Sequence, residues 1–406
     1  MQRKGSLIQK LVICYLILWT ISPPLGIDMK YRLLALGSVG IWGIIALGNK
    51  YYVEKIHVYA VAFAIMVAVI AYVEKGSLDG ILQQIALYML VICFVINAYY
   101  QEGHWHELSI IVPIILIFLI IFNYKTSQML LADPGIARKI VRADEQTFMY
   151  MRQGVGGYGL IYPQVCVFPA IVAWVKSAFR KNKVCCLIGC VWIYSFVSCL
   201  FSAGYSIAIY TSAIGVIILS FYKGKNSIRA LTITVVIFAG VLGALVYLEE
   251  FRSFMLTTFE GTEIVTKIND LLSTSESGAA EGSIYARVKA YSASVEAIVR
   301  YPIIGGLWNT SGGGHSAILD AIAKYGILGG FLCVKMLFYV PNEYKKRIDN
   351  PWIHRISNAV TISMLYVLLL NSAPFNFMAM LLLVLPILYE DIIRWENISN
   401  ESVMDS

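Results

Sequence analysis

The chain has 406 residues, of which 58% are hydrophobic and only 14% are charged. A mean hydropathy of +0.70 excludes an ordinary water-soluble domain, which must cover its surface with polar groups. The net charge of +7 is modest, the basic residues sit in alternate loops between apolar runs, and we expect no nucleic-acid partner.

Apolar runs long enough to cross about 30 Å of hydrocarbon recur along the whole chain. They predict an all-α fold, a polytopic membrane helix bundle of about 12 transmembrane helices in a single integral membrane domain, residues 1–406. The first run, Leu7 to Ile21, is interpreted as a span and not as a signal peptide, because no small-x-small cleavage site follows it. The predicted spans are residues 8–22, 31–48, 57–73, 80–97, 108–123, 159–179, 184–201, 204–221, 228–248, 316–340, 356–370 and 373–390.

The charges of the connecting loops set the topology. With the N-terminus inside, the short outer loops hold only Lys30, Arg32 and Lys75. The cytoplasmic side then holds Lys50, Lys55, Arg180, Lys181, Lys183, Lys223, Lys225, Arg229, Lys345, Lys346, Arg347 and Arg355. This bias follows the positive-inside rule, and an even number of spans places both termini in the cytoplasm. All eight cysteines fall inside predicted spans, so we expect no disulfide, and we expect no metal site.

Two connections are long, residues 124–158 and residues 249–315, and both fall on the outer side. Long loops in a compact fold are either functional or disordered. Apart from the stretch Ser273 to Ser283, these loops are neither Gly/Ser-rich nor highly charged, which favours a functional role.

The second long loop contains a predicted helix that begins near Ile284. Apolar residues, among them Val288, Tyr291 and Val295, recur at steps of three and four and form one stripe of an amphipathic helix. At about 100° per residue, Arg287 lies beside this stripe and is aimed toward the protein or its cavity. A snorkelling arginine at the membrane rim is the alternative interpretation.

Glycines connect this helix to the next span. The helix ends before Pro302, and Gly305 and Gly314 then precede His315, the only histidine in the long outer loops or at their margins. Glycine lets a backbone approach a ligand closely, although a loose turn would have the same composition. An interfacial helix-capping residue is the alternative interpretation of His315. One turn into the span, Asp320 and Lys324 are interpreted as a helix pair, with Asp320 not expected to orient His315.

The first long loop ends in a similar way. Arg152 precedes a run of glycines, and Tyr158 follows before the next predicted helix. An arginine beside a glycine-rich turn at a helix N-terminus favours an anion cradle, with a plain turn as the alternative. Tyr158 can stack on a sugar ring, but aromatic residues are also common at membrane interfaces for membrane reasons alone.

The second loop and the following span read Arg287-x13-Tyr301-Pro302-Ile303-Ile304-Gly305 and then His315-Ser316-x2-Leu319-x6-Gly326-Ile327-x-Gly329. This pattern resembles the O-antigen polymerase and O-antigen ligase superfamily, in which the large outer loop carries an Arg, a Pro-x-x-Gly turn and a His that opens a helix. The stretch Arg152 to Tyr162 is also similar to the upstream outer loop of capsule and O-antigen polymerases. The chain departs from the family at Phe201-Ser202-Ala203-Gly204-Tyr205-Ser206, where relatives often carry a Ser-Arg-Gly-like motif. If that arginine binds the donor phosphate in relatives, Arg152 replaces it here.

The resemblance implies a GT-C-like bundle in the bacterial inner membrane whose two long outer loops contain short helices. It implies transfer of a glycan from undecaprenyl pyrophosphate to an acceptor sugar hydroxyl, without a metal ion or cofactor. Arg287 and His315 would be catalytic, and Arg152, Tyr158, Gly305 and Gly314 would bind substrate. A lipid-linked oligosaccharide and membrane lipid are then the partners, and the resemblance also suggests a chain-length regulator and a flippase.

Three functions remain open at this stage. The first is a polymerase of surface polysaccharide (O-antigen, capsule or exopolysaccharide), in which donor and acceptor are both lipid-linked. The second is a ligase that passes the finished glycan to lipid A core or another acceptor. The third is a flippase or transporter of lipid-linked sugars, for which the charges along a central path and the related halves expected of a transporter are not found. The similarity of the stretch Arg152 to Tyr162 to the outer loop of capsule and O-antigen polymerases favours the polymerase.

Overall fold

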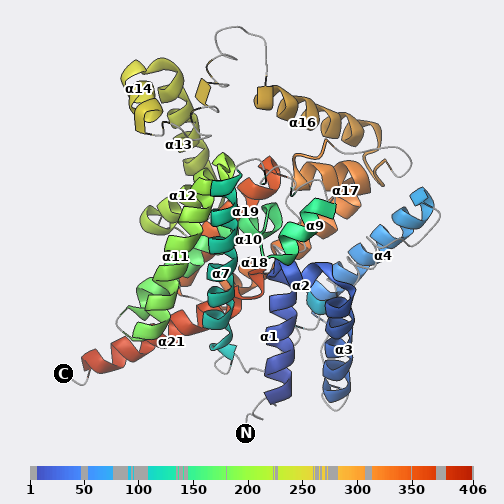
Figure 1. Cartoon of the computed structure of the whole chain (residues 1–406), viewed down its shortest axis with the longest axis vertical. Helices are drawn as coiled ribbons and strands as arrows, with labels where there is room; N and C mark the ends of the chain where they lie inside the picture. Colours follow the sequence, from blue (N-terminus) through green and yellow to red (C-terminus); the bar gives the residue numbers. More distant parts are fainter. Residues whose placement is uncertain are drawn as a thin grey trace.

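The computed structural model describes residues 7–46, 54–75, 90–92, 95, 108–133, 136, 140, 145–179, 181–222, 224, 227–258, 260, 265, 268–269, 272, 282–306, 313–348, 350–371 and 381–404. Within these residues every element is a helix, which confirms the predicted all-α class (Figure 1). The helices are α1 (Leu7–Ile21), α2 (Pro23–Ile27), α3 (Met29–Ala46), α4 (Lys55–Lys75), α7 (Ile111–Ala132), α9 (Glu145–Arg152), α10 (Tyr158–Ala178), α11 (Lys183–Ala203), α12 (Ser206–Phe221), α13 (Ser227–Tyr247), α14 (Glu249–Thr258), α16 (Gly282–Arg300), α17 (Ala317–Leu337), α18 (Tyr339–Arg347), α19 (Pro351–Leu370) and α21 (Leu385–Met404).

Six helices in the described part of the chain are long and apolar enough to cross a membrane, namely Ile111–Ala132, Tyr158–Ala178, Lys183–Ala203, Ile228–Leu245, Ala317–Leu337 and Pro351–Leu370. Large apolar side chains on several helices point outward, for example Ile65 and Leu187, which are 59% and 65% exposed. Outward apolar faces of this kind are typical of helices that face lipid. The chain is therefore a membrane protein, and its described part is built of helices. The predicted span 80–97 lies almost entirely outside the described residues, as does the first half of 373–390.

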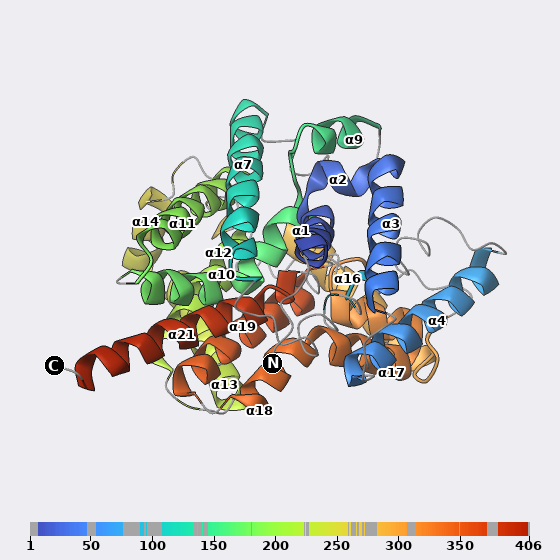
Figure 2. The same ribbon diagram turned by 90° about the horizontal axis from the view of Figure 1, so that it is seen from below.

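Helix α10 forms the centre of the bundle. It packs against α11, α12, α19 and α21, and the view from below shows these helices around it (Figure 2). Fifteen of its 21 residues are buried, because neighbouring helices enclose it on every side. A helix in this position is apolar all round and has no polar face. Through α19, this central helix is connected to the elements that carry the candidate site.

One buried polar network joins three helices of the bundle. Gln164 on α10 and Asn123 on α7 exchange two hydrogen bonds of 2.9 Å through their side-chain amides. The indole of Trp192 on α11 donates to Gln164 Oε1 over 3.1 Å. Because an unsatisfied polar group is costly in the hydrocarbon region, this mutual pairing holds the three helices in one register.

The first long loop is shorter than predicted. Helix α7 continues to Ala132, about two turns past the predicted boundary at residue 124. Polar residues of this extension are buried in contacts: Thr126 Oγ1 accepts from the Gly156 amide over 2.9 Å, and the hydroxyls of Ser127 and Ser202 lie 2.8 Å apart. At the other end of the chain, α21 runs to Met404 and passes the predicted end of the last span at residue 390.

The second long loop contains the predicted helix. Helix α16 covers Gly282–Arg300, and together with α14 it lies at the upper end of the bundle in Figure 1. Helix α1 begins, and α21 ends, at the lower end. The loop helices thus lie at the opposite end of the molecule from the outermost described residues of the two termini.

The predicted continuous span 316–340 is broken. Gly326 inside α17 has φ 69° and ψ −176°, which divides the helix in two. The turn after α16 occupies the break, since Gly306 N donates to Ala323 O over 3.0 Å and Ile327 N donates to Pro302 O over 2.8 Å. These bonds satisfy backbone groups that a continuous helix would have paired internally.

Candidate functional site

The site begins at the C-terminal end of α19. The guanidinium of Arg287 donates from Nη1 to the backbone oxygen of Leu370 over 2.9 Å, and the hydroxyl of Tyr291 donates to the same oxygen over 3.3 Å. Both donors come from α16 and are one turn apart, so they share a face of that helix. The last carbonyls of a helix have no partner within the helix and carry partial negative charge, which explains why a cation and a hydroxyl gather there.

Arg287 points into the protein, on the side that the sequence predicts, and so does Tyr291 of the apolar stripe, but the two valines of the stripe do not. Val288 and Val295 are 52% and 48% exposed, whereas Ser294 is 1% exposed. Small and polar residues let α16 approach the following segment closely: a Cβ built on Gly313 would lie 1.9 Å from the backbone oxygen of Ala290. The valines are consequently left on the outer surface.

Hydrogen bonds fix the segment around His315 from both sides. On one side Gly313 N donates to the Ser294 hydroxyl over 2.8 Å, and that hydroxyl donates to Asp320 Oδ1 over 2.6 Å. On the other side Ser316 N donates to Asp320 Oδ2 over 3.1 Å. His315 is thus held in a short arc between α16 and α17.

Ser316 also docks the segment onto α19. Its hydroxyl accepts from Leu319 N over 3.2 Å, as an N-cap residue does, and donates to Leu368 O over 3.3 Å. Ala317 N donates to the backbone oxygen of Asn371 over 2.9 Å. The end of α19 therefore supports both Arg287 and the segment that carries His315.

The surroundings of His315 favour its neutral form. Partial burial lowers the pKa of the imidazole, the positive charge of Arg287 lowers it further, and the carboxylate of Asp320 acts in the opposite direction. A neutral imidazole at pH 7 can accept a proton. Helical spacing predicts a pair of Asp320 with Lys324. In the structure the Asp320 carboxylate accepts hydrogen bonds from the Ser294 hydroxyl and the Ser316 amide, and it raises the pKa of His315.

Aromatic rings lead from the first long loop to this arginine. Tyr158 and Tyr162 at the start of α10 lie with ring centroids 5.3 Å apart, and Tyr205 at the start of α12 lies 4.7 Å from Tyr158 and 6.1 Å from Tyr162. Tyr162 is close enough to Arg287 and Tyr291 to interact with them electrostatically. The structure therefore brings Tyr158, Arg287 and His315 into one region.

Arg152 is placed differently. It closes α9, and its Nε and Nη2 bind Asp28 Oδ1 over 3.1 Å and 3.0 Å, in the segment that joins α2 to α3. The described structure shows no contact between Arg152 and Arg287. In the glycine turn that follows, one backbone donor is already used, because the Gly156 amide donates to the Thr126 hydroxyl. An anion at this turn would have to compete with these contacts.

The two candidate glycines have different surroundings. Gly305 has φ +76°, and a Cβ built on it would lie 2.2 Å from the backbone oxygen of Lys324, so its Cα is covered by α17. Gly314 also has φ +76°, but nothing lies within 4 Å of its added Cβ. Gly305 therefore serves helix packing, and only Gly314 borders open space beside His315.

Three contributors to this region were not predicted from the sequence. Ser294, Tyr162 and Tyr205 each have a partner in this region that lies far away along the chain, namely Asp320, Arg287 and Tyr158, respectively. No local spacing connects the members of these pairs. The burial of Ser294 on the Arg287 face of its helix is the one signal that a helical wheel could have given.

Comparisons with known proteins add no relatives. No family model matches the chain, and no curated protein matches it significantly.

Proposed function

We propose that the chain is a polymerase of bacterial surface polysaccharide that acts at the outer face of the inner membrane. It transfers a glycan from undecaprenyl pyrophosphate to a sugar hydroxyl of another lipid-linked repeat unit. The observation that carries the proposal is the meeting of Arg287 and His315 at the end of α19. Arg287 comes from the middle of the second long loop and His315 from its C-terminal end. They supply a fixed cation and a neutral base.

Arg287 suits the leaving group. A guanidinium matches phosphate oxygens with a planar fork of donors and stays charged at any physiological pH. Within the described residues, one of its five N–H groups donates to Leu370. The remaining donors can bind a diphosphate and neutralise the charge that develops as the sugar departs.

His315 suits the acceptor. The acceptor hydroxyl oxygen forms a new bond to the anomeric carbon of the donor sugar, and the bond from that carbon to the pyrophosphate oxygen breaks. The hydroxyl proton passes to the imidazole nitrogen of His315, and the electron pair leaves with undecaprenyl pyrophosphate. A lowered pKa keeps the imidazole available as this base at neutral pH.

Tyr158 suits the sugar. Its ring is partly exposed and is backed by the rings of Tyr162 and Tyr205, both of which are buried. Aromatic faces of this kind present apolar area to the faces of sugar rings, while hydroxyl groups around the ring remain available for hydrogen bonds. This platform lies on the Arg287 side of the site.

A strain of the source bacterium that lacks the gene tests the proposal, when it is complemented with wild type, His315→Ala or Arg287→Ala. Surface glycan is separated on a gel, and membrane levels of each protein are compared. We expect wild type to restore long chains and both variants to leave a single repeat unit on the acceptor. Arg300→Ala is the matched control, because Arg300 is exposed on the same helix and lies over the ring of Tyr301.

Other outcomes assign other functions. Long chains that accumulate on the lipid carrier would identify a ligase, which uses the same donor and a different acceptor. Repeat units that accumulate where an externally added glycosidase cannot reach them would identify a flippase. Normal polymer from His315→Ala at normal protein level would show that the base is wrongly assigned.

A further inference from the structure

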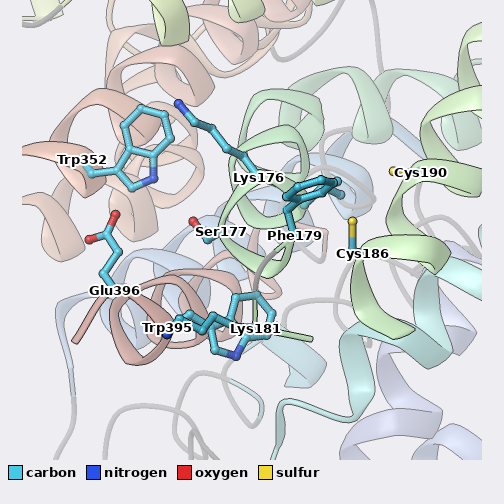
Figure 3. A pocket seen from close by; sticks show the side chains of 10 residues that line it. Lys176, Ser177, Phe179, Lys181, Cys186, Cys190, Trp352, Trp395 and Glu396 are labelled. Carbon is cyan, nitrogen blue, oxygen red and sulfur yellow. The ribbon is translucent and has the colours of Figure 1, made fainter. Parts of the chain in front are cut away.

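A second site lies at the other end of α10. A cavity of about 640 Å³ opens between the last turn of α10 and parts of α11, α19 and α21. Figure 3 shows Trp352 and Glu396 on one wall, Cys186 and Cys190 on the opposite wall, and Phe179 between them. The lining residues are Val175, Lys176, Ser177, Phe179, Lys181, Cys186, Cys190, Trp352, Trp395 and Glu396.

The charge in this cavity is predominantly positive. Lys176 extends over the ring of Trp352, with Nζ 5.0 Å from the ring centroid, and Lys181 is exposed at the rim. Arg355 lies over the same ring at 5.3 Å. The one carboxylate in the lining, Glu396, accepts a hydrogen bond from Asn350 Nδ2 over 3.2 Å. An anion that enters therefore meets two ammonium groups and a carboxylate that already has a donor.

The other wall is apolar and open to the outside. Phe179 is 69% exposed, and Val175, Cys186 and Cys190 continue the apolar surface along α10 and α11. Leu187, on the same turn of α11 as Cys186, is 65% exposed. A cavity lined by two lysines and by an open apolar wall matches a molecule with an anionic head and a hydrocarbon tail.

The position of the cavity at the ends of membrane helices indicates that this molecule is a lipid. The cavity lies at the ends of the candidate spans Tyr158–Ala178, Lys183–Ala203 and Pro351–Leu370, where headgroups meet hydrocarbon. Basic pockets between membrane helices bind anionic lipid headgroups, and each lysine or arginine near the surface contributes on the order of 1 kcal/mol. Tryptophan is common at this depth because its ring is apolar and its N–H is polar.

We propose that this cavity binds one anionic phospholipid. Its phosphate lies between Lys176 and Lys181, and an acyl chain follows Phe179 toward Cys186 and Cys190. The site is separate from the region of Arg287 and His315, since it is built at the opposite end of α10. It does not depend on the proposed polymerase activity.

Native mass spectrometry of the purified full-length protein tests the site, with phosphatidylglycerol and phosphatidylcholine supplied at equal concentration. We expect one phosphatidylglycerol to bind more tightly than any phosphatidylcholine. Lys176→Gln combined with Lys181→Gln should weaken phosphatidylglycerol binding about tenfold or more. Lys183→Gln combined with Lys346→Gln removes the same charge from exposed positions outside the lining and should leave binding unchanged. Equal loss in both double variants would overturn the proposal.

Thiol labelling of the wild-type protein gives a second test that needs no lysine variant. Cys190 is exposed and lines the cavity, so phosphatidylglycerol should slow its reaction with a maleimide, as read from the Cys190 peptide. Phosphatidylcholine and glycerol phosphate should not. Equal protection by both phospholipids would overturn selectivity for an anionic head, and equal protection by glycerol phosphate would identify a site for free phosphate instead of lipid.

Discussion

The hydroxyl of Ser294 on α16 donates a 2.6 Å hydrogen bond to the carboxylate of Asp320 on α17, and this pair brackets His315. Ser294 also accepts from Gly313, and Asp320 accepts from Ser316, so the two residues hold both ends of the arc that carries the histidine. A contact between two helices thereby sets the position of a side chain that belongs to neither of them.

Replacing Ser294 by Ala should move this arc. The variant leaves the Gly313 amide without its acceptor and removes one donor from Asp320, which costs about 1–3 kcal/mol of folding free energy at a buried position. We expect a lower midpoint of thermal unfolding and a loss of polymer larger than the loss of protein. Ser292→Ala is the control, because Ser292 is exposed on the same helix. If the two variants behaved alike, the bracket would have no role in positioning His315.

Replacing Asp320 by Asn should shift the titration of His315 to lower pH. Burial and Arg287 hold the pKa of His315 below its usual value of about 6.5, and Asp320 raises it. Removing the carboxylate removes the raising influence, so the neutral form then persists to lower pH. The rate at which diethyl pyrocarbonate modifies the His315 peptide follows the neutral imidazole and reports this midpoint directly.

The same measurement on Glu296→Gln provides the control for that shift. Glu296 is an exposed carboxylate of α16 that does not contribute to the pKa of His315, so its variant should titrate as wild type does. An upward shift of the Asp320→Asn midpoint would contradict the electrostatic account of the site.

Three glycine variants should lose different amounts of folding stability, depending on whether the added Cβ meets neighbouring backbone or open space. Gly305→Ala and Gly326→Ala combine positive φ with a Cβ placed 2.2 Å and 2.1 Å from backbone oxygens, and each should cost on the order of 3 kcal/mol or more. Gly314→Ala has the strained φ but open space, which corresponds to about 1–2 kcal/mol. The unfolding temperature in detergent ranks the stability losses of the three variants. Gly240→Ala is the helical control, because nothing lies within 4 Å of its added Cβ. Equal losses at all three positions would show that the contact with α17 is unimportant.

Arg152→Gln and Asp28→Asn should have different consequences if Arg152 binds substrate. Their ion pair is partly exposed, with side-chain exposures of 59% and 24%, and such a pair contributes at most about 1 kcal/mol. We expect both variants to fold, Arg152→Gln to reduce polymer, and Asp28→Asn to keep it because the guanidinium remains available to a diphosphate. Chain-length distribution on a gel measures this. Equal defects in both variants would show that Arg152 has only a structural role, in which it connects α9 to the segment before α3.

Much of the helical framework could be predicted from composition and periodicity. The range of α16 and the inward direction of Arg287 follow from the sequence because helical periodicity is a local property. The exposure of Val288 does not follow, since it depends on how closely α16 packs against a segment more than twenty residues away. The contact between Ser294 and Asp320 could not be predicted either, because it also depends on how α16 packs against a distant part of the chain.

The break at Gly326 illustrates a second limit of sequence interpretation. Mean hydropathy measures how favourable a span is in lipid, and it is the same for a continuous helix and for a divided one. The chain from Ala317 to Leu337 therefore reads as one span, although Gly326 has a non-helical conformation. Only the turn at Pro302 and Gly306, which pairs with the interrupted backbone, reveals why the division is tolerated.

This division has a consequence for the order of assembly during synthesis. The two halves of α17 can rest in the membrane only when Pro302 and Gly306 are present to take up the freed backbone groups. Those residues precede Gly326 in the chain and have left the ribosome before it does. The supporting turn is thus made first, and the interrupted segment is completed against a partner that already exists.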